Sequence, residues 1–163
     1  MYEVLLQALP NDYKEKLYLN ADSLAPAIVV SRYVTAERII NNSNHDLNIS
    51  PINGFKQIVE LGCGLSSHML NNLESEFIQV DFKDMIDLRK EVLKVASFDN
   101  KNINNLIVGD VTSKETWALI SEKIDSKKGP VAVLAEGLMM YLNTSQKKLL
   151  IDNLKWLKEV KKI

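Results

Sequence analysis

From residue 55 onward, short apolar runs alternate with longer stretches in which apolar residues recur every three or four positions. The short runs predict strands at 58–61, 77–80, 106–108 and 131–135. They are nearly continuous in apolar character, as expected for strands that are covered on both faces. The order of strand and helix, repeated four times, therefore predicts a parallel sheet with right-handed crossovers.

The segments between and after these runs predict helices. One helix is expected over about 66–73, and the next carries its apolar stripe on Met85, Leu88, Val92 and Val95. A helix through Trp117 follows Thr112-Ser113-Lys114-Glu115, which matches a capping box closed by Thr112 and Glu115. The last helix, about 145–160, is expected to bury Leu150, Leu154 and Leu157.

The first 54 residues have a different organisation. Helical segments are expected within 2–19 and over about 25–40, and a polar, turn-rich linker occupies 41–54. We therefore expect one compact domain of two parts: N-terminal helices with their linker at 1–54, and an alternating α/β part at 55–163. The fold class is α/β, a Rossmann-like three-layer α/β/α arrangement with a mainly parallel sheet of about four strands.

Composition narrows the function classes. The chain has 163 residues, 46% of them hydrophobic and 25% charged, which suits a globular domain. A formal net charge of −1 gives no reason to expect nucleic acid or an anionic membrane as partner. The single Cys63 excludes an internal disulfide and a cysteine-based zinc site. Without a signal peptide or a long apolar span, the expected location is cytoplasmic.

An acid stands at the end of every predicted strand: Glu60, Asp81, Asp110 and Glu136. Parallel strands end at the same edge of a sheet, and ligands of such folds bind beyond that edge. Any one of these acids could instead cap the helix that follows it, and for Asp110 the two interpretations are equally good. Four acids at four strand ends favour a binding site.

A glycine turn follows the first strand. Gly62 and Gly64 flank Cys63, and glycine permits positive φ and close approach of a ligand to the backbone. A tight strand-to-helix turn would use the same residues. A dinucleotide site prefers GxGxxG, but Ser67 stands where the third glycine would be, and Glu60 would repel a pyrophosphate. Asp81 suits the ribose of either ligand, so the pattern favours S-adenosylmethionine over NAD.

Four segments in this order resemble the leucine carboxyl methyltransferase-like family of class I S-adenosylmethionine-dependent methyltransferases. They are Val59-Glu60-Leu61-Gly62-Cys63-Gly64-Leu65-Ser66, Val80-Asp81-Phe82-Lys83-Asp84-Met85-Ile86, Gly109-Asp110-Val111-Thr112 and Ala135-Glu136-Gly137-Leu138-Met139-Met140-Tyr141-Leu142. The last segment is the most specific to this family. The resemblance implies a methyltransferase that uses S-adenosylmethionine.

The resemblance also implies a role for each site residue. Gly62 and Gly64 would line the methionine part of the cofactor, and Glu60 precedes that turn. Asp81 would hold the ribose, with Phe82 beside the adenine. The remaining assignments are Asp110 and Val111 at the adenine edge, Glu136 near the amino group or the reacting methyl, and Arg32, with Arg38 as second choice, at the cofactor carboxylate.

The expected reaction is methyl transfer to an oxygen of a small molecule, a carboxylate or a phenol, with no catalytic base that the sequence identifies. The family resembled here continues into three more strands, so the strand at 131–135 is expected at an exposed edge, open to a second copy or a partner. Two alternatives stay open: a truncated or non-catalytic cofactor-binding domain and, less favoured, an NAD-dependent oxidoreductase. Cys63 is expected to be a turn residue, and His45 and His68 are expected to be structural or solvated. Met139, Met140 and Tyr141 could face a substrate, but packing of this segment is favoured.

Overall fold

In the computed structural model, residues 55–71, 75–95 and 103–162 are described. They form a four-stranded sheet in the order β3-β2-β1-β4, with every neighbouring pair parallel. The strands are β1 (Gln57–Leu61), β2 (Glu76–Asp81), β3 (Leu106–Val108) and β4 (Val131–Leu134). The predicted α/β class and parallel sheet are confirmed, and each strand lies within a residue of its expected bounds.

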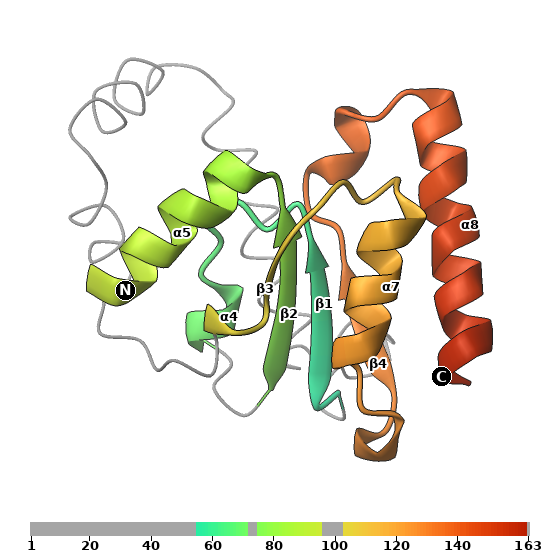
Figure 1. Cartoon of the computed structure of the whole chain (residues 1–163), viewed down its shortest axis with the longest axis horizontal. Coiled ribbons are helices and arrows are strands. Elements are labelled where there is room, and N and C mark those ends of the chain that lie inside the picture. The colour runs from blue at the N-terminus through green and yellow to red at the C-terminus, as the bar shows by residue number, and fades with distance from the viewer. Residues whose placement is uncertain (1–54, 72–74, 96–102, 163) are drawn as a thin grey trace, which may run out of the picture.

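Helices cover both faces of this sheet (Figure 1). On one face lie α4 (His68–Asn71) and α5 (Lys83–Val95), and on the other lie α7 (Lys114–Lys123) and α8 (Thr144–Lys161). Two 3₁₀ turns, η2 (Ser126–Lys128) and η3 (Leu138–Met140), flank β4. Among the described residues, no helix is both long enough and apolar enough to cross a membrane.

The strands are buried on both faces because their side chains alternate between two apolar clusters. Val59 and Leu61 point to the cluster that contains Trp117, a fully buried residue of α7. Ile58 and Phe77 point to the opposite cluster, with residues of α4 and α5. In α8, Leu150 and Leu157 are buried as predicted, and Leu154 packs against the first cluster.

The expected apolar stripe of α5 is wrong in part. The residues buried on this helix are Ile86, Arg89, Val92 and Leu93. Val95 is 67% exposed, and only Val92 of the predicted stripe is fully buried. The buried face contains an arginine, and a prediction from the spacing of apolar residues does not count an arginine as buried, so it selects the wrong face.

The expected capping box of α7 is also wrong. The N-cap is Ser113, whose hydroxyl accepts from the backbone N–H of Thr116. Thr112 instead donates its backbone N–H and its hydroxyl to Asp110 Oδ1, at 2.8 and 2.7 Å, so it serves the preceding turn. A capping box is present at the start of α8, between Asn143 and Gln146.

The strand order defines where a ligand would enter. From β1 the chain adds β2 and then β3 on one side, and then returns to add β4 on the other side of β1. Ligands of open α/β sheets bind at such a reversal, beyond the carboxyl ends of the strands. Here the reversal lies between β1 and β4, so the expected ligand position is beside the glycine turn and the segment that leads into η3.

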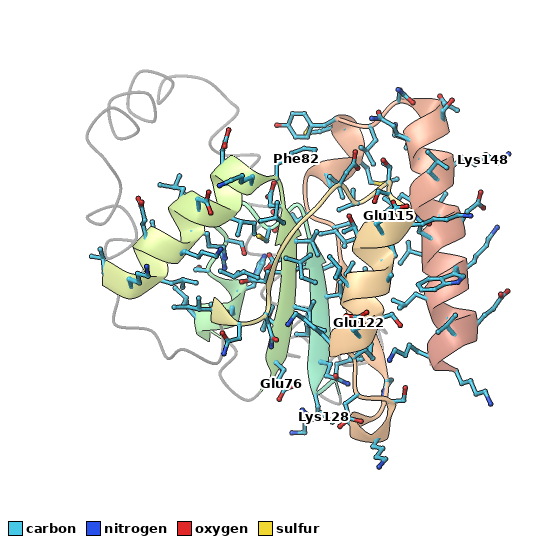
Figure 2. The ribbon with its side chains drawn as sticks, viewed as in Figure 1. Glu76, Phe82, Glu115, Glu122, Lys128 and Lys148 are labelled. Atoms are coloured by element: carbon cyan, nitrogen blue, oxygen red, sulfur yellow. The ribbon has the colours of Figure 1, made fainter. Side chains whose placement is uncertain are left out.

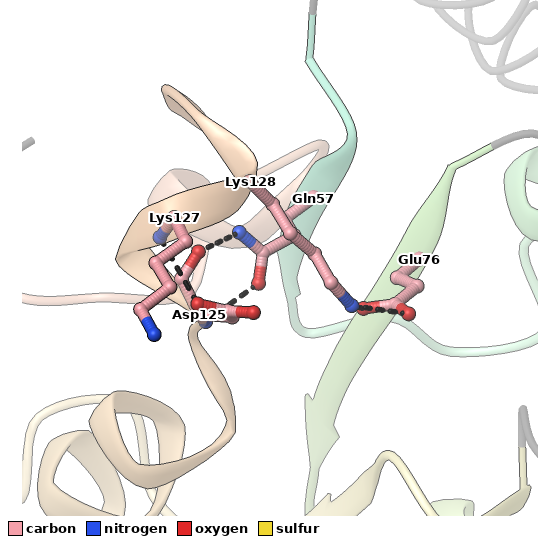
Figure 3. Close-up of polar contacts among 5 residues, drawn as sticks. All are labelled: Gln57, Glu76, Asp125, Lys127 and Lys128. Carbon is pink, nitrogen blue, oxygen red and sulfur yellow. Dashed lines mark hydrogen bonds and ion pairs between the residues drawn. The ribbon is translucent and has the colours of Figure 1, made fainter.

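At the other end of the strands, where β1 and β2 begin, a buried glutamine joins β1 to the segment before β4 (Figure 3). The amide of Gln57, fully buried, donates to the backbone oxygen of Asp125 and accepts from its backbone nitrogen, both at 2.8 Å. Nearby, Lys128 pairs with Glu76 of β2 at 2.6 Å in an exposed position. The segment before β4 is thereby attached to β1 and β2, far from the carboxyl ends.

We expect Gln57→Leu to lower the free energy of unfolding by about 1–3 kcal/mol, because both backbone groups of Asp125 would lose their partner. Lys128→Met should cost less than about 1 kcal/mol, because exposed ion pairs are weak. Urea unfolding followed by tryptophan fluorescence measures both. Equal costs for the two variants would contradict the assignment of Gln57 as the main polar tie at this edge.

Candidate functional site

The glycine turn continues the pairing of β1 with β2. The backbone nitrogens of Gly62 and Cys63 donate to the carbonyl of Val80, at 2.8 and 3.1 Å. Gly62 and Gly64 have φ of 64° and 49°, in the left-handed region that favours glycine. Among the described residues, no atom lies within 4 Å of a Cβ built on Gly64, whereas Leu138 lies 3.2 Å from a Cβ built on Gly62. The described part of the chain therefore leaves open space at Gly64.

Asp81, at the end of β2, is joined directly to this turn. Its Oδ2 accepts from the backbone nitrogen of Gly64 and its Oδ1 from that of Phe82, each at 2.8 Å. The side chain is partly exposed. An ionised carboxylate has about four acceptor positions, so it can hold the turn and still accept hydrogen bonds from a ligand.

The structure places Glu60 beneath the turn. Its carboxylate is 2% exposed and accepts from the hydroxyl of Ser66 and from the amide of Gln79, both at 2.6 Å. Glu60 is the fourth residue of β1, on the face that packs against α5. It therefore supports the turn from inside the protein, and is brought together with Gly62, Gly64 and Asp81 as one unit.

A residue that the sequence reading missed completes this support. Arg89 of α5 is 2% exposed and donates to Gln79 Oε1 and to the carbonyls of Gly64 and Ser66. One sequence signal could have found it. Arg89 lies three residues after Ile86 and four before Leu93, which is the spacing of a buried helix face.

Glu136, after β4, meets the helix that follows the glycine turn. Its Oε2 lies 3.0 Å from Nε2 of His68, which is fully buried, while the Glu136 side chain is 22% exposed. In the His68 tautomer that has its proton on Nε2, this nitrogen donates to the carboxylate. The pair connects α4 to the segment after β4 across the reversal in strand order. The expectation of a structural His68 is confirmed, but its partner was not foreseen.

The acid after β3 is occupied locally. Asp110 is exposed, and its Oδ1 holds the backbone and hydroxyl of Thr112. Val111 is 6% exposed within the first apolar cluster, and its carbonyl accepts from the indole nitrogen of Trp117 at 2.6 Å. For these two residues the structure shows a turn and a core position. Asp81 reaches this loop through its backbone oxygen, which accepts from Gly109 at 3.0 Å.

Two further expectations concern the rim of the site. Phe82 is 65% exposed, and Figure 2 shows it at the end of the molecule opposite to Glu76 and Lys128. The segment at 139–141 was expected to pack, and this is wrong: Met140 and Tyr141 are 66% and 81% exposed. Leu138 of η3 is partly buried against the first apolar cluster, and the next three side chains are exposed. Arg32, Arg38 and His45 lie outside the described residues.

Cys63 occupies the centre of the turn without being available as a nucleophile. It is 3% exposed. Burial, partly offset by the nearby charge of Arg89, raises the pKa of its thiol from 9.0 to about 12. The thiolate is the reactive form, so the expectation of a structural turn residue agrees with this environment.

A family model for leucine carboxyl methyltransferase matches residues 9–155, and so covers all four strand ends and most of the N-terminal part. The chain belongs to the leucine carboxyl methyltransferase family. Members of this family depend on S-adenosylmethionine. Neither the curated proteins nor the solved structures contain a significant match to the chain.

The site's chemistry fits the cofactor of this family. Within the described residues, the space at Gly64 lets a ligand approach the backbone, which a side chain at this position would hinder. The Asp81 carboxylate beside it retains acceptor positions for hydroxyl groups. Among the described residues, no group of three or more His, Cys, Asp or Glu side chains is arranged to hold a metal ion.

The thiol of Cys63 should react with iodoacetamide at pH 8 at least about 100-fold more slowly in the folded chain than in denaturant, because thiolate is scarce and buried. Mass spectrometry of quenched samples gives both rates. Similar rates would show that the turn does not shield Cys63.

Cys63 should also change how stability depends on pH. The folded pKa lies above the unfolded value, so its contribution is fully present below pH 9 and is lost as the pH rises toward 12. Compared with Cys63→Ala, the native chain should lose up to about 1.4 kcal/mol of unfolding free energy per pH unit in this window. Parallel pH dependences of the two proteins would contradict the raised pKa.

Proposed function

We propose that this chain binds S-adenosylmethionine at the carboxyl ends of β1 and β2 and transfers a methyl group to an oxygen of a small-molecule carboxylate or phenol. The observation that carries the proposal is the hydrogen bond from Gly64 to Asp81, next to open space at Gly64. It brings a glycine turn and an acid together in one place. In this proposal the turn serves the amino-acid part of the cofactor and the acid serves its ribose.

Asp81 is the residue we assign to the ribose. Its two oxygens are each held by one backbone N–H, from Gly64 and Phe82, so the carboxylate has a fixed orientation before a ligand arrives. Fixed charged acceptors lose little entropy on binding. The exposed ring of Phe82 follows directly and offers an apolar surface for the adenine.

Glu136 is the residue we assign to the amino group or the neighbourhood of the methyl. The His68 contact at 3.0 Å restrains its carboxylate, and the side chain keeps an exposure of 22%. A negative carboxylate here favours a cationic ligand over a pyrophosphate. Together with the absent third glycine, this supports methyl transfer over the hydride chemistry of an NAD-dependent oxidoreductase.

The remaining assignments follow the family resemblance. We propose Gly62 and Gly64 along the methionine part, the loop at Asp110 and Val111 at the adenine edge, and Arg32 at the cofactor carboxylate. Glu60 takes an indirect part in this proposal, because its buried carboxylate holds Ser66 and Gln79 under the turn.

The bound cofactor supplies a methyl carbon that its sulfonium already activates, so the protein mainly has to align the acceptor. A carboxylate acceptor is ionised at neutral pH and needs no proton removed, which agrees with a site in which the sequence identifies no base. The exposed Met139, Met140 and Tyr141 stand after β4 and offer apolar surface to an acceptor.

Isothermal titration with S-adenosylhomocysteine and with NADH tests the cofactor. We expect binding of the former only, and a loss of about 1.5–3 kcal/mol in Asp81→Ala, or roughly 10–150-fold in Kd. The matched control Asp84→Ala removes an exposed carboxylate three residues away and should leave Kd within about twofold. Binding of NADH alone, or unchanged affinity in Asp81→Ala, would overturn the assignment.

Transfer of a labelled methyl group from S-adenosylmethionine to panels of carboxylic acids and phenols tests the reaction. A methyl ester releases methanol in base and a phenol ether does not, so base treatment identifies the acceptor class. We expect labelled product, base-labile if the acceptor is a carboxylate and base-stable if it is a phenol. With Asp81→Ala at limiting cofactor concentration, this product should be lost. Tight cofactor binding with no product from either panel would favour the non-catalytic alternative.

A further inference from the structure

Arg89 contacts the glycine turn from below. Its Nη1 donates to the carbonyl of Gly64 at 3.0 Å and to that of Ser66 at 2.9 Å. Its Nε donates to Gln79 of β2 at 3.0 Å. A single side chain from α5 therefore fixes the turn at two points and also fixes it relative to the sheet.

Gly64 is held from both sides of its peptide unit. Its N–H donates to Asp81, at 2.8 Å, and its carbonyl accepts from Arg89. The Asp81 carboxylate is the group that we assign to the ribose. A movement of Gly64 would therefore release one oxygen of that carboxylate from its fixed orientation.

The hydrogen bonds close into a ring. Ser66 donates its hydroxyl to Glu60, Glu60 accepts from Gln79, Gln79 accepts from Arg89, and Arg89 donates to the carbonyl of Ser66. Glu60, Gln79 and Arg89 are at most 2% exposed. In this buried setting the opposite charges of Glu60 and Arg89 are connected through the amide of Gln79, and charge-assisted hydrogen bonds are the strong ones.

Burying this ring of polar and charged side chains costs free energy that an apolar filling would not cost. Within the described part of the chain, Nη2 of Arg89 is buried without a hydrogen-bond partner. Buried ion pairs are often no more stabilising than apolar residues of similar volume, and an unsatisfied donor lowers stability further. Stability alone does not account for an arginine at this position. The rigid guanidinium group does account for it, because it holds two donor nitrogens in fixed directions that a lysine cannot reproduce.

We propose that Arg89 is a positioning residue that fixes the glycine turn in the shape that binds the cofactor. This inference rests on the proposed function for its cofactor part. Its first part, that Arg89 holds the turn closed, concerns the protein alone and can be tested without any ligand.

Alkylation of Cys63 reports on the turn. In a turn that stays closed, loss of the nearby positive charge in Arg89→Met would raise the pKa of the Cys63 thiol further and slow its reaction. If Arg89 holds the turn closed, the variant should open it locally and react at least about tenfold faster than the native chain. The two explanations predict changes of opposite sign.

Two controls isolate the role of Arg89. Lys90→Met removes the neighbouring charge, a partly exposed ammonium group that lies 3.8 Å from the carboxylate of Asp87, and should change the alkylation rate by less than about twofold. Arg89→Lys keeps the positive charge but loses the guanidinium group that donates to the turn and to Gln79, and it should also accelerate alkylation. Should Arg89→Met fail to fold, Arg89→Lys, which leaves Glu60 in place and keeps a positive charge near Cys63, is judged by the same criterion.

Titration with S-adenosylhomocysteine tests the second part. We expect Kd to rise at least about tenfold in Arg89→Met and to stay within twofold in Lys90→Met and in Gln57→Leu, a variant weakened at the far edge of the sheet. An unchanged alkylation rate in Arg89→Met overturns the inference. So does faster alkylation with an unchanged Kd. If the native chain itself binds no S-adenosylhomocysteine, the proposed function fails, and alkylation still decides whether Arg89 holds the turn.

Discussion

The structure of the site depends on the parallel register of β1 and β2. Leu61 pairs with Val80, and the next backbone nitrogens of the β1 strand, those of Gly62 and Cys63, continue onto the Val80 carbonyl. Because a parallel pair brings equivalent ends together, the glycine turn arrives beside Asp81. A shift of one residue would exchange the two faces of β1. The register therefore fixes both the apolar core and the contact between Gly64 and Asp81.

The two faces of the sheet have different tasks. On the side of α7 and α8, Val59 and Leu61 pack in an apolar cluster around Trp117. On the side of α5, the carboxyl half of the sheet is polar, since Glu60 and Gln79 lie there under the turn with Arg89. Apolar packing is tolerant of small movements, whereas hydrogen bonds are directional. The polar carboxyl half of the α5 side is thus suited to fixing the turn, and the apolar clusters on both sides to stabilising the fold.

Membership of the leucine carboxyl methyltransferase family gives this arrangement its context. The strand order reverses between β1 and β4, and there the contact between His68 and Glu136 connects the helix after the glycine turn to the segment after β4. At the amino ends of the strands, the hydrogen bonds of Gln57 to Asp125 hold the segment before β4 against β1, so the strands are restrained at both ends.

The sequence by itself determined the strands, the parallel sheet and the location of a glycine turn and Asp81 at strand ends, because periodicity and glycine chemistry are local properties. It also indicated Cys63 as a turn residue. Only the tertiary structure decided that Glu60 supports the turn from within, that Asp110 closes its own turn, and that Arg89 and His68 belong to the site. These roles depend on which face of an element meets which neighbour. A buried arginine resembles a surface residue in a hydropathy pattern, and only its partners across the fold reveal what it holds.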